Sequence, residues 1–502
     1  MPNASDSVGL KSDLQLPAYF RGQRASLLKS TANHPLRATM TSSAFSSLAL
    51  APVLLQNLDS LGYQQMTEIQ AQSLPLILEG RDLIAQAKTG SGKTAAFGLG
   101  LLHRLNPSYF AIQGLVLCPT RELADQVAQE LRRLARQADH IKVLTLCGGA
   151  PMGPQIASLQ HGAHIVVGTP GRIRDHLGRG SINLGTVKML VLDEADRMVD
   201  MGFYDDIAGI VSACPSHRQT LLFSATYPDD IRRASAQFLR QPAEVKVEAQ
   251  HDNSRIEQRF YKVADDQRAA AVVALLQHYR PTSALLFCNT KIRCRELVQA
   301  LQQQGFSALA LYGDLEQRDR DETLLQFANQ SCSVLVATDV AARGLDISSL
   351  SAVINVDVSK DTEVHIHRVG RTGRAGDKGL ALCLASPSEN KWVKLIEQYQ
   401  DRPVEWFDLP VPEAGSEPLQ APMVTLNIFG GKKDKLRPGD ILGALTGEAG
   451  IPAAKIGKIN VFEFYSYVAV SRDVAQLALK RLSNGQIKGR KAKARFLQGP
   501  AD

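Results

Sequence analysis

The 502-residue chain contains no apolar stretch that approaches the roughly 18 consecutive residues of a membrane-spanning helix. Its seven cysteines never form a CxxC pair, and most of them sit inside apolar segments. The eleven histidines show no metal-ligand spacing. These absences argue against a membrane protein, a zinc module and a disulfide framework, and they predict buried, reduced thiols in a cytoplasmic protein.

Acidic residues are scarce at the start of the chain. Residues 1–40 contain only Asp6 and Asp13 and show no apolar periodicity. A basic, acid-poor targeting peptide could have this composition. We expect instead a disordered extension over residues 1–40, or a start codon placed too far upstream, because Met40 lies just before recognisable structure begins.

Net charge is unevenly distributed along the chain. Residues 421–502 hold 14 Lys and Arg against 6 Asp and Glu, a net charge of +8, whereas the rest of the chain holds 43 basic and 44 acidic side chains. A local basic excess of this kind is typical of a surface that binds a polyanion such as nucleic acid. A solvated basic face without a partner is the alternative.

Short apolar runs alternate with amphipathic helical patterns over most of the chain, which predicts parallel sheets covered by helices on both faces. Polar residues interrupt this alternation at 241–256, and a proline-rich segment ends it at 410–422. We therefore expect α/β domains over 41–245 and 246–409, a linker over 410–422 and a third unit over 423–498. The predicted strands include residues 83–86, 115–118, 143–146, 165–167, 190–192 and 221–223, and then 284–287, 308–311, 334–337, 353–356 and 380–384.

The third unit has a different order of elements. Its apolar pattern predicts strands at 424–429, 456–462, 465–470 and 491–496, with helices at 438–450 and 472–482. This βαββαβ order is that of the ferredoxin-like or RRM arrangement. The expected fold class is therefore α/β for the first two domains and α+β for the third.

A glycine-rich segment between a predicted strand and an apolar helix has the pattern of a phosphate-binding loop. Gly90 and Gly92 leave backbone N–H groups free to face phosphate oxygens, and Lys93 can reach the β and γ phosphates. Thr94 can offer its hydroxyl to Mg²⁺. Ala87 stands where the general pattern has glycine. The predicted nucleotide-binding residues here are Ala87, Lys88, Thr89, Gly90, Ser91, Gly92, Lys93 and Thr94.

The other groups that phosphoryl transfer requires lie farther along the chain. Asp193 and Glu194 end a predicted strand, so that Asp193 can hold Mg²⁺ and Glu194 can orient or deprotonate a water molecule. An acidic helix start is the alternative for residues 193–196. Arg371 and Arg374 follow a predicted helix that stops near residue 370, where they can face the first domain. The predicted catalytic residues are Lys93, Asp193, Glu194, Arg371 and Arg374, with Thr94 and Asp193 as metal ligands.

Several further short motifs lie between residues 119 and 374. They are PTRELA at 119–124, TPGR at 169–172, DEAD at 193–196, SAT at 224–226, ATDVAARGLD at 337–346 and HRVGRTGR at 367–374. Between about Phe45 and Leu409 the chain resembles the DEAD-box RNA helicases. The resemblance implies two tandem RecA-like domains that use ATP to separate RNA strands locally, with Arg371 and Arg374 as arginine fingers.

The resemblance also implies roles for individual residues. The segment GYQQMTEIQ at 62–70 is similar to the family's Q motif, in which Gln70 contacts adenine. Phe45 matches the upstream aromatic residue that stacks on the base, Tyr63 stands where phenylalanine is commoner, and Asp346 is implied near the ribose. RNA-backbone contacts are implied for Thr120, Arg121, Gly149, Thr169, Arg172, Thr338 and Asp339, with Gln317 and Arg320 as further candidates, and Ser224 and Thr226 would link the ATP and RNA sites.

The third unit is similar to the RNA-binding domain of the bacterial DbpA helicases, through NIFGGKKDKLRPGD at 427–440, IGKI at 456–459 and KGR at 488–490. It departs from an ordinary RRM, because Glu463 and Phe464 stand where a basic residue and glycine belong, although Tyr465 and Tyr467 are kept. Base stacking and cross-strand packing therefore both remain open for these tyrosines. The implied RNA contacts in basic loops are Lys432, Lys433, Lys435, Arg437, Lys488 and Arg490.

Together these features predict an RNA-dependent ATPase that locally unwinds or remodels RNA, with ATP and Mg²⁺ as cofactors. The DbpA-like domain implies targeting to 23S ribosomal RNA in precursor particles of the large ribosomal subunit, in the cytoplasm. A general cold-shock or mRNA-decay helicase and an ATP-gated RNA clamp are the alternatives. We expect neither a membrane nor a DNA partner.

Overall fold

The computed structural model describes residues 43–87, 90–138, 140–227, 229–247, 256–342, 350–373, 379–411, 418–447 and 450–497. The extension expected over residues 1–40 lies outside these ranges. Among the described residues, no helix has the length and apolar character needed to cross a bilayer. All seven cysteines are buried, with free thiols.

The first domain is built on a parallel sheet whose described strands run in the order β3-β4-β2-β5-β6-β1-β7. Parallel neighbours require crossover connections, and helices supply them here. The carboxyl ends of all the strands therefore meet at one edge of the sheet. The strands are β1 (Leu83–Gln86), β2 (Gly114–Leu117), β3 (Val143–Leu146), β4 (Ile165–Gly168), β5 (Met189–Asp193), β6 (Gln219–Ser224) and β7 (Ala243–Lys246).

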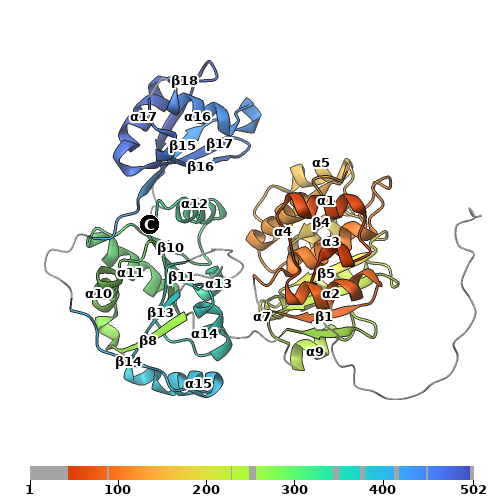
Figure 1. Cartoon of the computed structure of the whole chain (residues 1–502), viewed down its shortest axis with the longest axis horizontal. Helices are drawn as coiled ribbons and strands as arrows, with labels where there is room; N and C mark the ends of the chain where they lie inside the picture. Colours follow the sequence, from red (N-terminus) through yellow and green to blue (C-terminus); the bar gives the residue numbers. More distant parts are fainter. Residues whose placement is uncertain are drawn as a thin grey trace, which may run out of the picture. The chain divides into compact units, whose positions relative to one another are not determined.

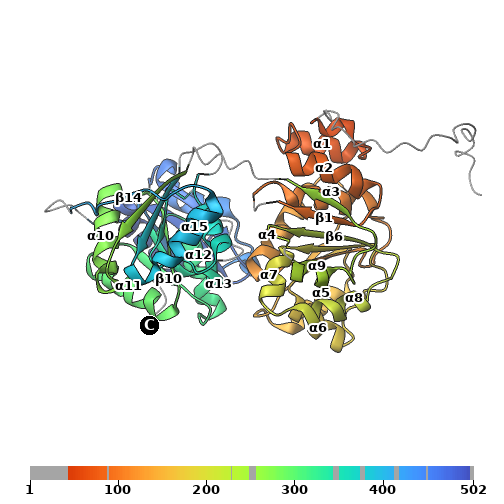
Figure 2. The ribbon, with the colours of Figure 1, turned by 90° about the horizontal axis from the view of Figure 1, so that it is seen from below.

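Helices cover both faces of this sheet because its central strands are apolar on both sides. Figure 2 shows α2 (Glu68–Leu78) and α3 (Lys93–Arg104) on one side of β1 and β6, and α8 (Tyr204–Ser212) and α9 (Asp229–Ser235) on the other. The carboxyl edge is left for the loops that follow the strands. The remaining helices are η1 (Phe45–Ser47), α1 (Pro52–Ser60), α4 (Arg121–Leu134), α5 (Met152–Gln160), α6 (Pro170–Gly178) and α7 (Ala195–Asp200).

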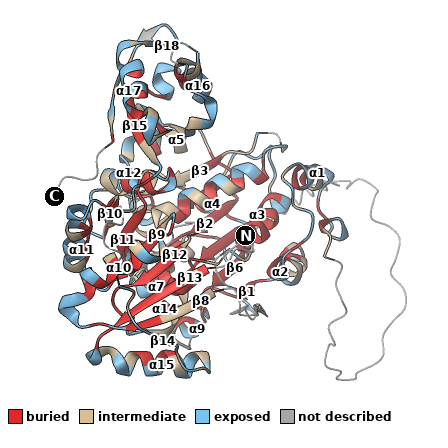
Figure 3. Ribbon diagram, turned by 60° about the vertical axis from the view of Figure 1, so that its left-hand side comes forward, coloured by how far each residue is buried: buried red, intermediate tan, exposed pale blue. Residues whose placement is uncertain are grey.

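The second domain is another parallel sheet, with the order β10-β11-β9-β12-β13-β8-β14. Figure 3 shows the strands of both sheets as buried and parts of the surrounding helices as exposed. The strands are β8 (Ile256–Lys262), β9 (Ala284–Cys288), β10 (Ala308–Leu311), β11 (Val334–Thr338), β12 (Ala352–Asn355), β13 (Gly379–Ala385) and β14 (Trp406–Phe407). The helices are η2 (Asp265–Gln267), α10 (Arg268–Tyr279), α11 (Lys291–Gln303), α12 (Gln317–Ala328), α13 (Asp339–Ala342), α14 (Thr362–Val369), η3 (Pro387–Glu389) and α15 (Asn390–Gln400).

The sequence predicted the strands of both sheets to within two residues, except for β7, β8 and β14, which it did not predict. The segment 241–256, expected as a polar break, contains all of β7 and the first residue of β8. In β7, which lies at the edge of its sheet, only Val245 is buried, and Glu244 and Lys246 are exposed. Strands with one polar side lack the continuous apolar run that marks a central strand of a parallel sheet.

The third domain has the predicted βαββαβ order, with an antiparallel sheet arranged β16-β17-β15-β20. In Figure 1, α16 and α17 lie beside this sheet. Leu426 and Ile428 of β15 and Val468 and Val470 of β17 form its buried face and pack in one cluster with residues of both helices. The elements are β15 (Met423–Phe429), η4 (Lys432–Asp434), α16 (Pro438–Thr446), η5 (Ala453–Lys455), β16 (Ile456–Val461), β17 (Tyr465–Ser471), η6 (Arg472–Val474), α17 (Ala475–Asn484), β18 (Gln486–Ile487), β19 (Arg490–Lys491) and β20 (Lys493–Phe496).

Candidate nucleotide and RNA sites

The glycine-rich loop lies between the end of β1 and the start of α3. Gly90 and Gly92 have φ angles of 83° and 95°, a backbone region that favours glycine. A Cβ atom on Gly92 would also lie 2.5 Å from Nε2 of Gln70. The φ angle therefore favours glycine at this position, and the Gln70 amide packs directly on it. Lys88 and Thr89 lie outside the described residues.

Gln70 joins the Q-motif segment to the glycine-rich loop. Its side-chain amide donates to the Gly92 carbonyl oxygen at 3.0 Å, and its Oε1 accepts from the Thr67 backbone N–H at 2.9 Å. Tyr63 and Phe45 make an edge-to-face contact, with ring centroids 6.1 Å apart. The structure thus places these predicted nucleotide-binding residues in one part of the first domain.

Lys93 and Asp193 are both buried at the carboxyl edge of the sheet. The Lys93 ammonium group donates to the Ala87 carbonyl oxygen at 2.9 Å. Burial raises the pKa of Asp193 to about 6, although the positive charge of Lys93 opposes this shift. A cation beside Asp193 would favour its ionised form further. Carboxylate and hydroxyl oxygens are ligands that Mg²⁺ prefers, so Asp193 and the half-buried Thr94 fit this ion.

Glu194 is held in place by a buried partner that the sequence motifs did not identify. Nη1 of Arg197 donates to Oε2 of Glu194 at 2.9 Å, and both side chains are less than one tenth exposed. Glu194 itself has a φ of 53°, a strained value for a residue with a side chain. The signal for this pair was an acid and a base three residues apart at a helix start.

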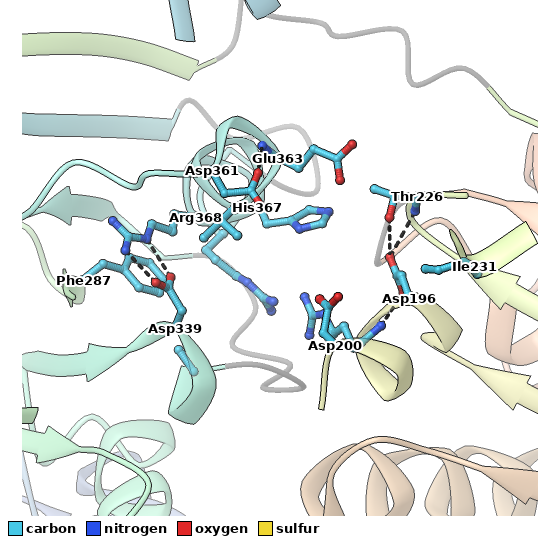
Figure 4. A pocket seen from close by; sticks show the side chains of 14 residues that line it. Asp196, Asp200, Thr226, Ile231, Phe287, Asp339, Asp361, Glu363, His367 and Arg368 are labelled. Carbon is cyan, nitrogen blue, oxygen red and sulfur yellow. Dashed lines mark hydrogen bonds and ion pairs between the residues drawn. The ribbon is translucent and has the colours of Figure 1, made fainter. Parts of the chain in front are cut away.

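The Ser-Ala-Thr motif contacts the last acidic residue of the DEAD sequence. The Asp196 backbone N–H donates to Oγ of Ser224 at 3.3 Å. Both the backbone N–H and the hydroxyl of Thr226 donate to Oδ2 of Asp196 at 3.1 Å, as Figure 4 shows. The segment after β6 is therefore tied to the segment after β5.

Side chains from both helicase domains line a cavity of about 200 Å³ (Figure 4). Burial lowers the pKa of His367 to about 4, and the positive charge of Arg197 lowers it further, so His367 is neutral at neutral pH. Arg371 is 5% exposed, and Arg374 lies outside the described residues. The lining includes Asp196, Arg197 and Thr226 of the first domain and Asp339, His367, Arg368 and Arg371 of the second.

Arg368 is a structural arginine, although it stands in the same motif as Arg371. Its Nε and Nη2 donate to the two carboxylate oxygens of Asp339, each at 2.7 Å, and its guanidinium lies over the Phe287 ring at 5.1 Å. The carboxylate of Asp339 is thus engaged by an arginine, and a direct contact with RNA stays a prediction.

A second cavity, of about 520 Å³, brings together several of the predicted RNA contacts. Nη1 of Arg121 donates to Oε1 of Gln317 at 2.6 Å, and Arg320 forms an ion pair with Glu122. A Cβ atom on Gly149 would lie 1.7 Å from Nη1 of Arg121, so this arginine packs directly on the glycine backbone. The lining includes Thr120, Arg121, Thr169, Arg172, Gln317 and Arg320.

Two further RNA candidates of the helicase domains do not line the 520 Å³ cavity: Thr338 ends β11, and Asp339 lines the smaller cavity. The predicted ribose contact, Asp346, lies outside the described residues.

Three family models match successive parts of the chain. The DEAD/DEAH box helicase model matches residues 67–234, the helicase conserved C-terminal domain matches 267–376, and the DbpA RNA binding domain matches 425–496. The ATP-dependent RNA helicase DbpA of Escherichia coli (strain K12) is 52% identical over 456 residues, which cover 91% of this chain and 100% of that relative. The chain is a DEAD-box RNA helicase of the DbpA subfamily.

Other relatives match a smaller share of this DbpA-type helicase. The DEAD-box ATP-dependent RNA helicase CshA of Bacillus subtilis (strain 168) is 43% identical over 377 residues, which cover 75% of this chain and 76% of that relative. The structure of S. cerevisiae Dbp5 bound to RNA and ADP BeF3 matches with a TM-score of 0.68 at 30% identity, covering 73% of this chain and 96% of that one. The two helicase-domain matches and the DbpA relative together make this helicase an RNA-dependent ATPase.

In the RNA-binding domain of this helicase, the two predicted basic loops meet. Nζ of Lys488 donates to the Lys435 carbonyl oxygen at 3.1 Å and lies 3.7 Å from Oδ2 of Asp440. Lys435 and Lys488 both have a left-handed backbone, with φ angles of 59° and 52°. Strained positions of this kind cluster at functional sites. The exposed side chains of the combined surface, called the basic loop surface below, are Lys432, Lys433, Lys435, Arg437 and Lys488.

Close backbone packing fixes the shape of the first basic loop. The Lys432 and Lys433 backbone N–H groups donate to the carbonyl oxygens of Phe462 and Glu463 at 2.8 and 3.0 Å. A Cβ atom on Gly431 would lie 2.3 Å from the Phe462 oxygen, so only glycine fits there. The side chain of Arg490 is not among those described.

The two tyrosines of β17 have different surroundings in this helicase. Tyr467 is 7% exposed, and its hydroxyl donates to Oε1 of Glu322 at 3.1 Å. Tyr465 makes an edge-to-face contact with Phe429 at 5.9 Å, and the guanidinium of Arg318 lies 5.7 Å from its ring centre. Both tyrosine rings therefore pack against other side chains. The basic loop surface is more accessible to RNA than these rings.

Proposed function

We propose that this helicase remodels 23S ribosomal RNA during assembly of the large ribosomal subunit, in the cytoplasm, and that its C-terminal domain selects the RNA. The match of residues 425–496 to the DbpA RNA binding domain supports this proposal most directly. The basic loop surface adds a physical reason, because exposed lysines attract phosphates and a fixed loop shape can select one RNA structure.

For ATP hydrolysis, we assign Lys93 to the β and γ phosphates and Glu194 to the attacking water. The ion pair with Arg197 supports the role of Glu194, because it fixes the carboxylate in one position. Thr94 and Asp193 would hold Mg²⁺, which neutralises phosphate charge when bound. The proposed cradle is completed by Ala87, Lys88, Thr89, Gly90, Ser91 and Gly92.

Recognition of the nucleoside is assigned to the segment before the cradle. Gln70 would contact adenine, with Phe45 and Tyr63 beside the base and Asp346 near the ribose. Arg371, with Arg374 of the same motif, would supply positive charge opposite the γ-phosphate. Since Lys93 and Arg371 belong to different domains, efficient hydrolysis requires both domains to close on one ATP.

The RNA track is assigned to both domains as well. Thr120, Arg121, Gly149, Thr169 and Arg172 would hold one strand on the first domain, and Thr338 and Asp339 would continue it on the second. Closure around ATP then bends this strand away from its partner. We assign residues 41–245 and 246–409 to the helicase domains, 410–422 to the linker and 423–498 to the RNA-binding domain.

Charge reversal in the basic loop surface tests whether this surface selects ribosomal RNA. The triple substitution Lys432→Glu, Lys433→Glu and Lys435→Glu should raise the concentration of a 23S rRNA hairpin that half-saturates ATPase stimulation by at least about tenfold. It should also flatten the salt dependence of binding to a duplex, by about 0.9 unit of slope for each phosphate that the protein no longer neutralises. Lys480→Glu, on an exposed site of α17, is the matched control.

Stimulation by an arbitrary duplex separates the possible outcomes. Wild-type protein should prefer the ribosomal hairpin, and the triple variant should respond equally to both RNAs. Equal responses in wild-type protein would favour a general cold-shock or mRNA-decay helicase. ATP-dependent RNA retention without strand separation would indicate an RNA clamp.

A further inference from the structure

Helix α4 extends from the predicted RNA cavity to the segment that carries the predicted adenine contacts. The helix begins at Arg121, and the Leu123 backbone N–H donates to the hydroxyl of Thr120 at 3.3 Å, which caps the helix. Its 14 residues span about 21 Å at 1.5 Å per residue. One rigid element therefore has an end in each region.

The far end of α4 is capped by a side chain from α1. Nδ2 of Asn57 donates to the carbonyl oxygens of Arg133 and Leu134, at 3.1 and 2.7 Å. Asn57 is 1% exposed. Carbonyl groups in the last turn of a helix have no partner within the helix, so this buried amide fixes the helix end to the segment that follows Phe45.

Tyr63 makes a second connection to the same turn of α4. Its hydroxyl donates to Oε1 of Glu130 at 2.7 Å, and Nη1 of Arg133 lies 3.3 Å from Oε2 of Glu130. The Arg133 guanidinium also lies 5.8 Å from the centre of the Tyr63 ring. Burial raises the pKa of Tyr63 to about 12, and the bond to Glu130 adds to this shift, so the hydroxyl remains a donor.

The ring of Tyr63 also faces the predicted base-stacking residue. Phe45 meets it edge to face, and Phe45 is itself buried. The phenylalanine that is commoner at position 63 has no hydroxyl and could not donate to Glu130. This chain therefore has a polar contact between α4 and the aromatic pair beside the predicted adenine site.

We propose that α4 transmits nucleotide occupancy to the RNA-contacting residues at its start, and that Glu130 is the positioning residue that connects Tyr63 to the helix. The inference rests on the proposed roles of Tyr63 and Arg121. A nucleotide that orders Phe45 and Tyr63 favours one placement of the last turn of α4. Because the helix is rigid, Arg121 at its other end is ordered with it.

The coupling is measured with four equilibrium constants on the full-length protein. A labelled single-stranded RNA is titrated with and without a non-hydrolysable ATP analogue, and the analogue is titrated with and without the RNA. Linkage requires the two ratios of dissociation constants to be equal. Glu130→Ala should leave both binary affinities within twofold of wild type and reduce both ratios about fivefold.

Two variants distinguish loss of the hydrogen bond between Tyr63 and Glu130 from a general effect on α4. Glu130→Gln keeps an oxygen that can accept from the Tyr63 hydroxyl and should restore most of the coupling. Gln129→Ala changes the neighbouring exposed residue of the same helix and should match wild type. Melting temperatures of all variants establish that the domain is folded.

Three results would overturn the proposal. In the first, the ratios of dissociation constants for Glu130→Ala equal those of wild type. In the second, Glu130→Ala weakens binding of RNA alone and of the ATP analogue alone by the same factor as it weakens binding of each in the presence of the other. In the third, Glu130→Gln behaves like Glu130→Ala. Arg121→Ala tests the underlying site assignment separately. If that variant bound RNA as wild type does, the predicted RNA contact would be wrong whatever Glu130 showed.

Discussion

In the first helicase domain, β1 leads into the glycine-rich loop and α3, whereas in the second domain the corresponding strand, β8, leads into η2 and α10. Both strands hold the same place in sheets of the same strand order. Residues 263–267, between β8 and α10, contain no glycine. The fold is repeated, and the loop at the carboxyl edge differs.

Arg268 occupies the start of α10, where the first domain has Lys93 at the start of α3. Arg268 is 3% exposed, and its Nε lies 2.9 Å from Oδ1 of Asp265. It also pairs with Glu389, and its Nη1 lies 3.6 Å from Oδ1 of Asp357, just beyond β12. The second domain thus pairs its own charges at the position where we assign the lysine of the first domain to phosphates.

The two domains share one architecture, but the basic side chain at the start of the corresponding helix has different surroundings in each. In the first domain, Lys93 and Asp193 are buried without a direct ion pair between them in the described contacts, so they can respond to a bound ligand. In the second domain, Arg268 is engaged by carboxylates of the same domain. In the proposed mechanism, Arg371 would bring the second domain into the chemistry of the first.

The largest expected effect comes from removing the proposed contribution of the second domain to hydrolysis. Arg371→Ala should lower RNA-stimulated ATP turnover by about 10³-fold, the typical contribution of an arginine finger. RNA affinity without nucleotide should be unchanged, as should the turnover of Arg136→Ala, an exposed control. A steady-state rate within threefold of wild type would show that the second domain does not act on the γ-phosphate.

A substitution in the Arg268 cluster should affect stability instead of chemistry. Arg268→Ala removes a buried guanidinium that pairs with Asp357 and Glu389, although Asp357 keeps Arg293 at 3.3 Å, and it should lower the free energy of unfolding by about 3 kcal/mol. Arg318→Ala breaks the more exposed ion pair with Glu322 and should cost less than about 1 kcal/mol. Denaturant titration of both variants checks the comparison, and equal losses would contradict it.

Acid should destabilise the second domain through His365. Burial lowers the pKa of His365 from 6.5 to about 3, so between these values the unfolded chain binds more protons than the folded one. Stability is therefore fully present above pH 6.5 and is lost as the pH falls below it. At pH 5 the loss is about 2 kcal/mol.

His365→Phe should remove this acid loss, because a neutral ring would pack beside Phe260, whose centroid lies 6.1 Å from the histidine ring. Unfolding at pH 7 and pH 5 provides the comparison, with His103→Gln as an exposed control. An unchanged difference between the two pH values in His365→Phe would assign the acid sensitivity to other groups.

Much of the fold could be predicted from the sequence because most strands of the two parallel sheets are continuous apolar runs. The strands at 83–86, 143–146 and 308–311 were predicted at their observed bounds, although β3 and β10 lie at the edges of their sheets. The edge strand β7 was not, because Glu244 and Lys246 interrupt its apolar residues. Predictability therefore followed the apolar run within each strand and not the position of the strand in its sheet.

For the candidate site, the order and spacing of motifs identified the family, and the roles of the individual residues stay predictions. The partner of Glu194, the engagement of Asp339 by Arg368 and the meeting of Lys435 with Lys488 could not be predicted, because each joins side chains through folding of the loops. A sequence motif gives the residue, and the loop packing gives its partner.

The most direct test of the contrast between the two domains is the number of nucleotides that one chain binds. Equilibrium titration of wild-type protein with a fluorescent, non-hydrolysable ATP analogue should give one site per chain. Lys93→Ala should abolish that site while its melting temperature in the absence of nucleotide stays close to that of wild type. Two sites per chain, or a site that survives Lys93→Ala, would contradict the assignment of nucleotide binding to the first domain alone.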